Sequence, residues 1–443
     1  MEIPKLPPIL EYSQTLVFQF PARLWNLQKH NWRRLLAATP ANTRFLVFSS
    51  LFWSLPLALT EPYRGLYYSR LGLDPLQIGA VVGLDMGLRI VGVVLGGLLP
   101  SRLGYRNTLN LFDLTSWVVP ALILGLARHP WQVTLATVFF STNSMGAAAY
   151  QCLFLEGVRD ARRGMAYGMS NLTNILPGVL LPWLASWLVT RFDFVQAMRV
   201  MFLCQSALML AGICLRQRGL RDVPVPPLPR GAAGGGRAAA ARLKAEFTGA
   251  VRALARSRRI ALILPLSILF NLFNTLWGYY YPVYVTRQLG LPDSLPGILA
   301  EAGALCFAVS TIVFLPRVRP RGAPGVFFLA QVAGLSSLLL LKWAPGPGGL
   351  LCLAVFSNLS GAVVTAILAA LFAGAMPEGS RAWAFGLSFC LQQAVLALGV
   401  PFFGGLFQIH FGYFPWAAMG LALAQAAFGF ALWKGGLGRP QIP

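Results

Sequence analysis

The sequence predicts an all-α membrane protein whose twelve transmembrane helices form two six-helix bundles related by pseudo-symmetry. Of its 443 residues, 56% are hydrophobic and 11% are charged, whereas a soluble domain carries about 25% charged residues. Several almost uncharged stretches reach the roughly 20 residues that a helix needs to cross a bilayer. Such runs exclude a transmembrane β-barrel, whose strands alternate apolar and polar residues. A repeat within the sequence indicates the division into two bundles.

The apolar stretches lie six on each side of a long middle segment. In chain order, the expected helices span 44–66, 76–99, 107–127, 131–156, 165–190, 196–215, 259–287, 294–315, 325–342, 348–375, 382–408 and 413–433. We therefore expect a tail at 1–43, a first bundle at 44–215, a second bundle at 259–433 and a tail at 434–443.

The middle segment, 216–258, differs in composition from the helices around it. Its stretch VPVPPLPRGAAGGGR is rich first in proline and then in glycine, which is typical of a flexible linker. In the following AAAARLKAEFTGAVRALARSRR, apolar residues recur at helical spacing between basic ones. This pattern predicts an amphipathic helix on the membrane surface.

Basic residues gather on one side of the predicted membrane. Counting the basic residues at the adjoining helix ends, the tails, the middle segment and every second loop hold 28 Lys and Arg residues, against five on the opposite side. Because short cytoplasmic loops carry an excess of these residues, we expect both tails and the middle segment to face the cytoplasm at the cell membrane. The net charge of +22 is then a topology signal and an attraction for anionic lipid headgroups, not a nucleic-acid surface.

The sequence repeats itself at about half its length. RGMAYGMS at 163–170 is answered by RAWAFGLS at 381–388, and SRLGL at 69–73 by TRQLGL at 286–291. Three single residues also have counterparts 216 positions later: Asp85 corresponds to Glu301, Gly87 to Gly303 and Pro100 to Pro316. These matches predict a duplicated six-helix unit. An even number of helices gives both copies the same orientation, around an axis along the membrane normal.

The loop after the second helix carries the most specific family motif. GLLPSRLGYR at 97–106 resembles the G-x-L-x-D-R-x-G-x-R motif of the major facilitator superfamily, with Ser101 where that family usually has Asp. The resemblance covers nearly the whole chain. It implies two bundles around a central substrate path, and hence a secondary transporter that moves a small solute by alternating access, coupled to protons. Import and export both stay open.

The same loop is a candidate conformational latch. Its matching positions are Gly97, Leu99, Arg102, Gly104 and Arg106. Arg102 and Arg106 can extend to the cytoplasm and pair with Glu156 at the end of the fourth helix, or with the last carbonyls of nearby helices. Such pairs would latch the halves together, and Ser101 predicts a weaker latch than Asp would give. The alternative is a plain basic loop that only sets topology.

Few ionisable residues lie within the predicted helices, where charge is costly and usually faces a cavity or a partner. Glu61 and Arg64 are three residues apart, and Asp85 and Arg89 are four apart, so each pair shares a helix face. Either pair can be a structural ion pair or part of a substrate site. Asp113 is interpreted as structural. The buried arginines favour an anionic or zwitterionic solute.

Glu301 is the main candidate for proton coupling, with its repeat partner Asp85 as the second. The predicted helices contain one more acid than base, with Glu61, Asp85, Asp113 and Glu301 against Arg64, Arg89 and Arg199. Glu301 has no base on its own helix or in its own half. A carboxylate without a base can exchange a proton reversibly, whereas one held by Arg stays ionised.

Uncharged polar residues complete the predicted substrate site. The seventh helix contains FNLFNTLWGYYYPVYV, and part of its tyrosines belong to the interfacial aromatic belt. The candidates for substrate binding, besides Glu61, Arg64 and Arg89, are Asn143, Asn274, Tyr280, Tyr281 and Gln392. Prolines are expected to break helices beside this site, at Pro56, Pro62, Pro265 and Pro282.

Other functions compete with transport. A non-transporting membrane sensor or assembly factor on the same fold is the main alternative, and a membrane-embedded lipid-modifying enzyme is a lesser one. The sequence contains no GxSxG and no GxxxxGK[ST] motif, and its Cys and His residues lack metal-ligand spacing. We therefore expect no metal and no cofactor. The expected partners are a small solute, protons and membrane lipids, and the expected state is a monomer.

Overall fold

The structure is a computed structural model that describes residues 39–158, 160–223, 248, 258–314, 323–375 and 381–434. The proline- and glycine-rich stretch, and nearly all of the predicted amphipathic helix, lie outside the described residues. The same is true of most of the two predicted tails.

The described residues of the first half form a series of helices, several of which follow one another within a single span. These comprise α2 (Ala41–Ser49), α3 (Leu51–Thr60), the 3₁₀ turn η1 (Glu61–Tyr63), α4 (Arg64–Arg70), α5 (Pro75–Leu98), α6 (Pro100–Leu103), α7 (Tyr105–Asp113), the π-helical η2 (Leu114–Val118), α8 (Val119–Gly125), α9 (Pro130–Ser141), α10 (Asn143–Leu155), α11 (Asp160–Arg191) and α12 (Phe194–Gly219). Capping fixes where α5 begins, because the Asp74 carboxylate accepts the Gln77 N–H at 2.7 Å while the Gln77 side chain accepts the Asp74 N–H.

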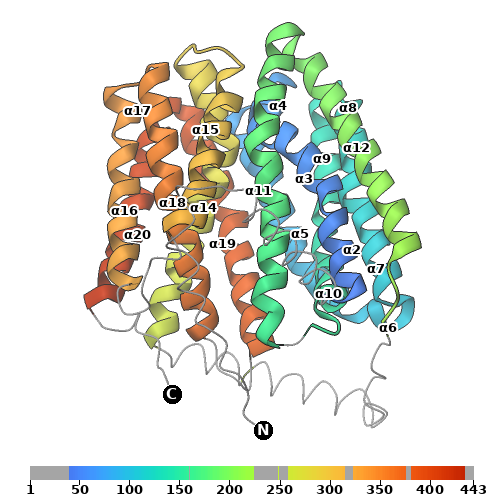
Figure 1. The fold of residues 1–443 in the computed structure, drawn as a ribbon. Coiled ribbons are helices and arrows are strands. Elements are labelled where there is room, and N and C mark those ends of the chain that lie inside the picture. Colours follow the sequence, from blue (N-terminus) through green and yellow to red (C-terminus); the bar gives the residue numbers. More distant parts are fainter. Residues whose placement is uncertain are drawn as a thin grey trace, which may run out of the picture.

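The described residues of the second half repeat this plan. They comprise α14 (Arg258–Val283), the π-helical η4 (Tyr284–Gln288), α15 (Leu295–Val309), the π-helical η5 (Ser310–Phe314), α16 (Ala323–Leu338), α17 (Leu340–Trp343), α18 (Pro347–Ala375), α19 (Arg381–Ile409), the 3₁₀ turn η8 (Phe411–Tyr413) and α20 (Phe414–Lys434). Figure 1 shows the halves side by side as two bundles, blue to green and yellow to red.

The all-α membrane fold predicted from the sequence is confirmed. Among the described residues, 11 helical segments are long and apolar enough to cross a membrane. The remaining predicted span, at 131–156, is present as α9 and α10, with a break at Thr142. One predicted boundary is wrong in a way that affects the site: the sixth span continues past residue 215 and ends at Gly219.

The predicted repeat is visible in equivalent local structure. RGMAYGMS lies near the start of α11, and RAWAFGLS at the start of α19, the fifth span of each half. Gly72 and Gly290, the glycines of the two copies of the SRLGL-like segment, both have positive φ values, of 100° and 67°. A left-handed turn of this kind favours glycine, which explains why both copies contain one there.

The most extensive contact between the two halves is that of α5 with α19. A Cβ atom added to Gly83 would lie 2.6 Å from the carbonyl oxygen of Ala397 and 2.7 Å from Cγ of Pro401. A Cβ atom added to Gly79 would come similarly close to Val400 and Pro401 of the same helix. Small residues that let backbones approach are the usual means of helix association in membranes.

The contacts between the halves gather at one end, which we call the far end, comprising the loops 71–74, 126–129 and 289–294. The opposite end, where α6, Gly219 and Lys434 lie, is the linker end (Figure 1). At the far end, Arg70 pairs with Asp293 at 2.8 Å. Within the described residues, every hydrogen bond found between the halves lies at this end. This conformation is therefore closed at the far end.

The repeat accounts for the symmetry of this closure. Arg70 and Arg287 are the arginines of the two SRLGL-like copies, and each reaches the opposite half. Arg70 pairs with Asp293, while the Arg287 guanidinium donates to the Ser69 carbonyl at 2.6 Å. Beside them, the Ser294 carbonyl accepts from the hydroxyls of two first-half residues, Tyr63 and Ser186.

The packing of α5 on α19 predicts different effects of alanine at two glycines one turn apart. Gly83→Ala should destabilise the protein by about 1–3 kcal/mol, because the added methyl overpacks the contact with Ala397. Gly87→Ala is the control, since its Cβ would lie 4.0 Å from the nearest atom, the Cβ of Ala397. Thermal unfolding of the purified variants measures the difference, and equal midpoints would contradict this account of the contact.

Candidate functional site

A cavity of about 440 Å³ lies between the two halves. Both halves line it, with α11 and η1 on one side and α14, α15 and α18 on the other. Its polar and aromatic lining residues are Glu61, Asn174, Trp277, Tyr281, Ser357 and Asn358. A volume of this order is typical of small-molecule sites. The cavity therefore has the size and the position of a central solute site.

Glu61 reaches this cavity because the first span is interrupted. The 3₁₀ turn η1 separates α3 from α4, with Pro62 inside it, so the helix break predicted at Pro62 is confirmed. The predictions for Pro56 and Pro265 are wrong, since α3 and α14 continue through them. Pro282 lies inside α14 as well, one residue before π-helical η4 begins. The Glu61 side chain stays 50% exposed and pairs with Arg64, with 2.6 Å between Oε1 and the guanidinium.

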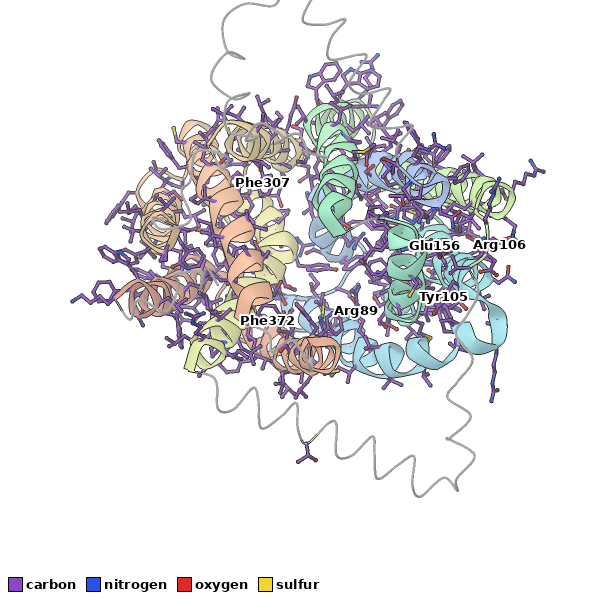
Figure 2. All side chains as sticks on the ribbon, turned by 60° about the horizontal axis from the view of Figure 1, so that its bottom comes forward. Arg89, Tyr105, Arg106, Glu156, Phe307 and Phe372 are labelled. Carbon is purple, nitrogen blue, oxygen red and sulfur yellow. The ribbon has the colours of Figure 1, made fainter. Side chains whose placement is uncertain are left out.

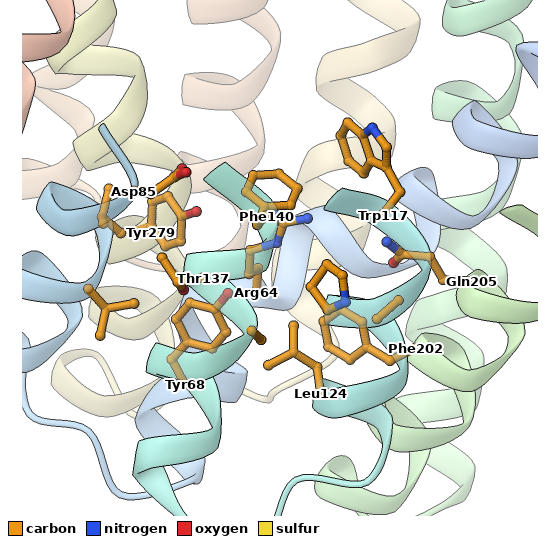
Figure 3. Close-up of a pocket in the computed structure, with 15 residues that line it drawn as sticks. Arg64, Tyr68, Asp85, Trp117, Leu124, Thr137, Phe140, Phe202, Gln205 and Tyr279 are labelled. Carbon is orange, nitrogen blue, oxygen red and sulfur yellow. The ribbon is translucent and has the colours of Figure 1, made fainter. Parts of the chain in front are cut away.

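Two ion pairs of the first half meet at one aromatic ring. Arg64 is buried, and its guanidinium lies 5.2 Å from the centroid of the Phe140 ring. The guanidinium of Arg89, which pairs with Asp85 at 2.9 Å, lies 5.1 Å from the same centroid. Figure 3 shows Arg64 between Phe140 and the tyrosines Tyr68 and Tyr279. Each arginine is thus held by a carboxylate and by the Phe140 ring. The two arginines therefore no longer favour an anionic solute.

A third ion pair was missed by the sequence analysis. Arg216, which the predicted boundary assigned to the middle segment, lies in α12 with 3% of its surface exposed. It pairs with Asp113 at 2.7 Å, donates to the Ser49 hydroxyl at 2.8 Å and covers the Trp53 ring at 3.7 Å. Asp113 is therefore paired with α12, and not with the arginines of the loop after α5.

The remaining buried base has a backbone partner. Arg199 donates to the carbonyl of Ala127, with nitrogen–oxygen distances of 2.7 and 3.1 Å. This carbonyl follows the end of α8, where a cation also complements the helix dipole. Counting Arg216, the acids and bases of the helices are equal in number, so the predicted excess of one acid is wrong.

Glu301 nevertheless has no basic partner among the described residues. It lies on the face of α15 that packs against the first half, because Gly297 and Ala304 are one turn away on either side. A Cβ on Gly297 would meet Tyr63 and Pro182, and Ala304 lies 3.8 Å from a Cβ placed on Gly178. Glu301 is thus on the side of α15 that faces α11.

The uncharged residues predicted for the substrate site separate in the structure. Tyr281 lines the central cavity, while Asn143 lines a second cavity of about 280 Å³ inside the first half, beside Asp113 and Arg216. Asn274 lines a smaller cavity inside the second half. Tyr280 is fully buried and donates its hydroxyl to the Pro75 carbonyl at 2.9 Å. Its predicted place in the substrate site is therefore wrong, because it closes the far end.

Gln392 and Arg89 complete the predicted set. Gln392 accepts a hydrogen bond of 2.9 Å from Asn271, which joins α19 to α14. Figure 2, seen from the linker end, places Arg89 on the first half near the space between the bundles. The sequence analysis missed Asn174, which lines both the central cavity and the first-half cavity, and also Ser357 and Asn358. Amides and hydroxyls spread singly over apolar helices carry no recognisable pattern.

The loop predicted as a latch is attached to its own half in this conformation. Gly104 has a φ of 77°, which explains the second glycine of the motif. The Arg106 N–H donates to Asp222 at 3.2 Å, and its guanidinium donates to the Leu220 carbonyl at 3.4 Å. The predicted bond to a helix-ending carbonyl is thus present. No ion pair with Glu156 is found among the described residues, although Figure 2 shows both residues in the first bundle.

Arg102 is exposed in this conformation. The surroundings of Gly97 and Ser101 lie outside what the structure describes. The role of this loop as a latch between the halves stays a prediction. Within the part of the chain that the structure describes, no three His, Cys, Asp or Glu residues gather as a metal site would require.

Comparison with known proteins identifies the family. The sequence model of the Major Facilitator Superfamily matches residues 41–400. This chain belongs to the major facilitator superfamily. Membership supports a multi-pass membrane transporter rather than an enzyme. No curated protein sequence matches the chain significantly.

Solved structures of other transporters share the superfamily fold with this chain. A nucleoside transporter, NupG, is 14% identical with a TM-score of 0.63, covering 89% of this chain and 99% of its own. A peptide transporter, POT, in complex with sulfate is 15% identical with a TM-score of 0.64, covering 92% and 99%. A D-xylose-proton symporter is 16% identical with a TM-score of 0.62, covering 88% and 96%.

The buried pair of Asp113 and Arg216 generates a stability prediction. Asp113→Asn should destabilise the protein by about 3–5 kcal/mol, because it leaves Arg216 as an uncompensated charge in an apolar interior. The double variant Asp113→Asn, Arg216→Met should recover much of that loss, since it removes both charges. Thermal unfolding of the purified variants measures each change. A double variant less stable than Asp113→Asn would show that the two residues do not act as a pair.

Proposed function

We propose that this protein is a secondary transporter that moves a small polar solute across the cell membrane by alternating access, coupled to protons. The proposal rests chiefly on the 440 Å³ cavity, which lies between two pseudo-symmetric halves and receives lining residues from both. Closure of the halves by hydrogen bonds at the far end fits one of the two states that alternating access requires. With the linker end in the cytoplasm, this state faces inward.

Proton coupling is assigned to Glu301, with Asp85 as the second candidate. Glu301 lies on the side of α15 that faces α11, without a described base, whereas Asp85 is held by Arg89. A change of charge on Glu301 would alter the contact between the halves, because an ionised carboxylate in an apolar interface is costly and a protonated one is less so. Protonation and conformation are thereby linked.

The coupling assignment predicts that Glu301→Gln abolishes uphill accumulation while leaving exchange of solute for solute intact. Gln imitates the protonated carboxyl group and cannot release a proton. The measurement uses purified protein in liposomes, with a solute first identified by thermal shift and its uptake compared with and without a proton gradient. Glu301→Asp is the control and should retain accumulation. Full proton-driven accumulation by Glu301→Gln would refute the assignment.

The same assay separates the alternatives. A transporter gives flux of a solute that it binds, whereas a sensor or assembly factor on this fold gives binding without flux. If flux through the wild-type protein does not depend on the proton gradient, the protein is a transporter but is not coupled to protons.

The orientation predicts which residues an impermeant thiol reagent can reach in intact cells. In a background without the native cysteines, Arg218→Cys at the linker end should be shielded, because this end is assigned to the cytoplasm. Pro292→Cys in the exposed far-end loop is the matched control and should be labelled. The reverse pattern of labelling would invert the topology.

A further inference from the structure

We propose that the central cavity recognises a protonated amine, and that Glu61 is its anionic contact. The inference rests on the proposed function, because it names the class of solute for the same cavity. It replaces the expectation of an anionic solute, since the arginines behind that expectation are held by carboxylates and by the Phe140 ring.

The charge of the cavity is the first argument. Among its described lining residues, Glu61 carries the one ionisable group of either sign apart from the Tyr281 phenol. Arg64 engages a single oxygen of Glu61, Oε1, and approaches from a buried position. Half of the Glu61 side chain remains exposed. An ammonium group bound there would complete a base–acid–base arrangement, whereas an anion would meet a carboxylate and no free base.

The hydrogen-bonding capacity of the cavity is the second argument. The Ser357 hydroxyl and the Asn358 amide each donate a hydrogen bond to the carbonyl of Ala354 in their own helix, at 3.4 and 2.9 Å. Their oxygen atoms remain as acceptors. The Asn358 amide keeps a second N–H, but with the Glu61 carboxylate the cavity offers more acceptor sites than donors, so a ligand rich in donors, such as an ammonium group, suits it best.

An unpartnered buried group is the third argument. Tyr281 lines the cavity with 7% of its surface exposed, and its buried hydroxyl has no hydrogen-bond partner among the described residues. A buried polar group without a partner is costly. A donor from a bound ammonium would satisfy its oxygen. The Trp277 ring, stacked on Tyr281 at a centroid distance of 4.2 Å, adds an apolar wall for the carbon skeleton of the ligand.

Two sets of matched probes test the charge preference on full-length protein in detergent. The aromatic set is 2-phenylethylamine, 2-phenylethanol, 3-phenylpropanoate and phenylalanine. The linear set is hexylamine, hexanol, hexanoate and 6-aminohexanoate. In at least one set, the amine or the zwitterion should raise the unfolding temperature and bind at least about tenfold more tightly than the alcohol and the carboxylate. Preference for the amine identifies a monocation, and preference for the zwitterion identifies an amino acid-like solute.

Variants then locate the contact. Glu61→Gln should weaken binding of the preferred probe at least about tenfold, and Tyr281→Phe, which removes one hydroxyl, should weaken it by a smaller factor. Asp193→Asn is the matched control, because it removes an exposed carboxylate outside the cavity, at a position where Asn still caps α12, and should leave affinity unchanged. Tyr281→Phe keeps the test valid if Glu61→Gln does not fold.

The inference is overturned if an alcohol or a carboxylate binds as tightly as its amine, if no amine or zwitterion binds, or if Tyr281→Phe and Glu61→Gln bind like the wild type. These results are distinct from failure of the proposed function. Binding of an amine without flux would support the inference and contradict the proposed transport. Flux of an anion would support transport and contradict the inference.

Discussion

The cost of placing charge in hydrocarbon governs how this protein is built. In the first half, the four arginines within the spans each have a carboxylate or carbonyl partner: Arg64 has Glu61, Arg89 has Asp85, Arg216 has Asp113 and Arg199 has Ala127. Breaking such a pair is costly, and the last two contacts join different helices, so they hold α12 against α7 and against the end of α8. The second half has no described pair of this kind, and its carboxylate at Glu301 lies where the halves meet. Charged contacts between helices are thus a feature of the first half, whereas both halves have buried apolar cores.

Most of the fold could be predicted from the sequence, because hydrophobic length and an internal repeat are long-range signals that average over many residues. The positions of Gly72 and Gly290 show how a repeat in sequence becomes a repeat in backbone geometry. Single boundaries were less certain. Arg216 was assigned to the linker because a charge in sequence resembles a helix end. Its spacing from Gln205 and Met209 on the buried face of α12 was the signal that could have identified it.

The site could be predicted only in part. Glu61 and Tyr281 were found because a carboxylate and a phenol within a membrane span are rare enough to be noticed. Asn174 and Asn358 were not, since their place at the cavity depends on how α11 and α18 face each other across the two halves. Tyr280 differs from Tyr281 by one position, and that step of about 100° along a helix takes it from the cavity to the far-end contact. Sequence alone does not specify this rotation.

The Phe140 ring has a mechanical consequence. Two guanidinium groups from different helices, Arg64 of α4 and Arg89 of α5, rest on this single ring of α9. Displacing any one of these helices would remove a cation from an aromatic face and expose charge to an apolar medium. The three helices therefore resist shear among themselves, and a load applied at Glu61 is carried to α5, the helix that contacts α19. These three helices would then move as one stiff body against the glycine-lined contact with α19.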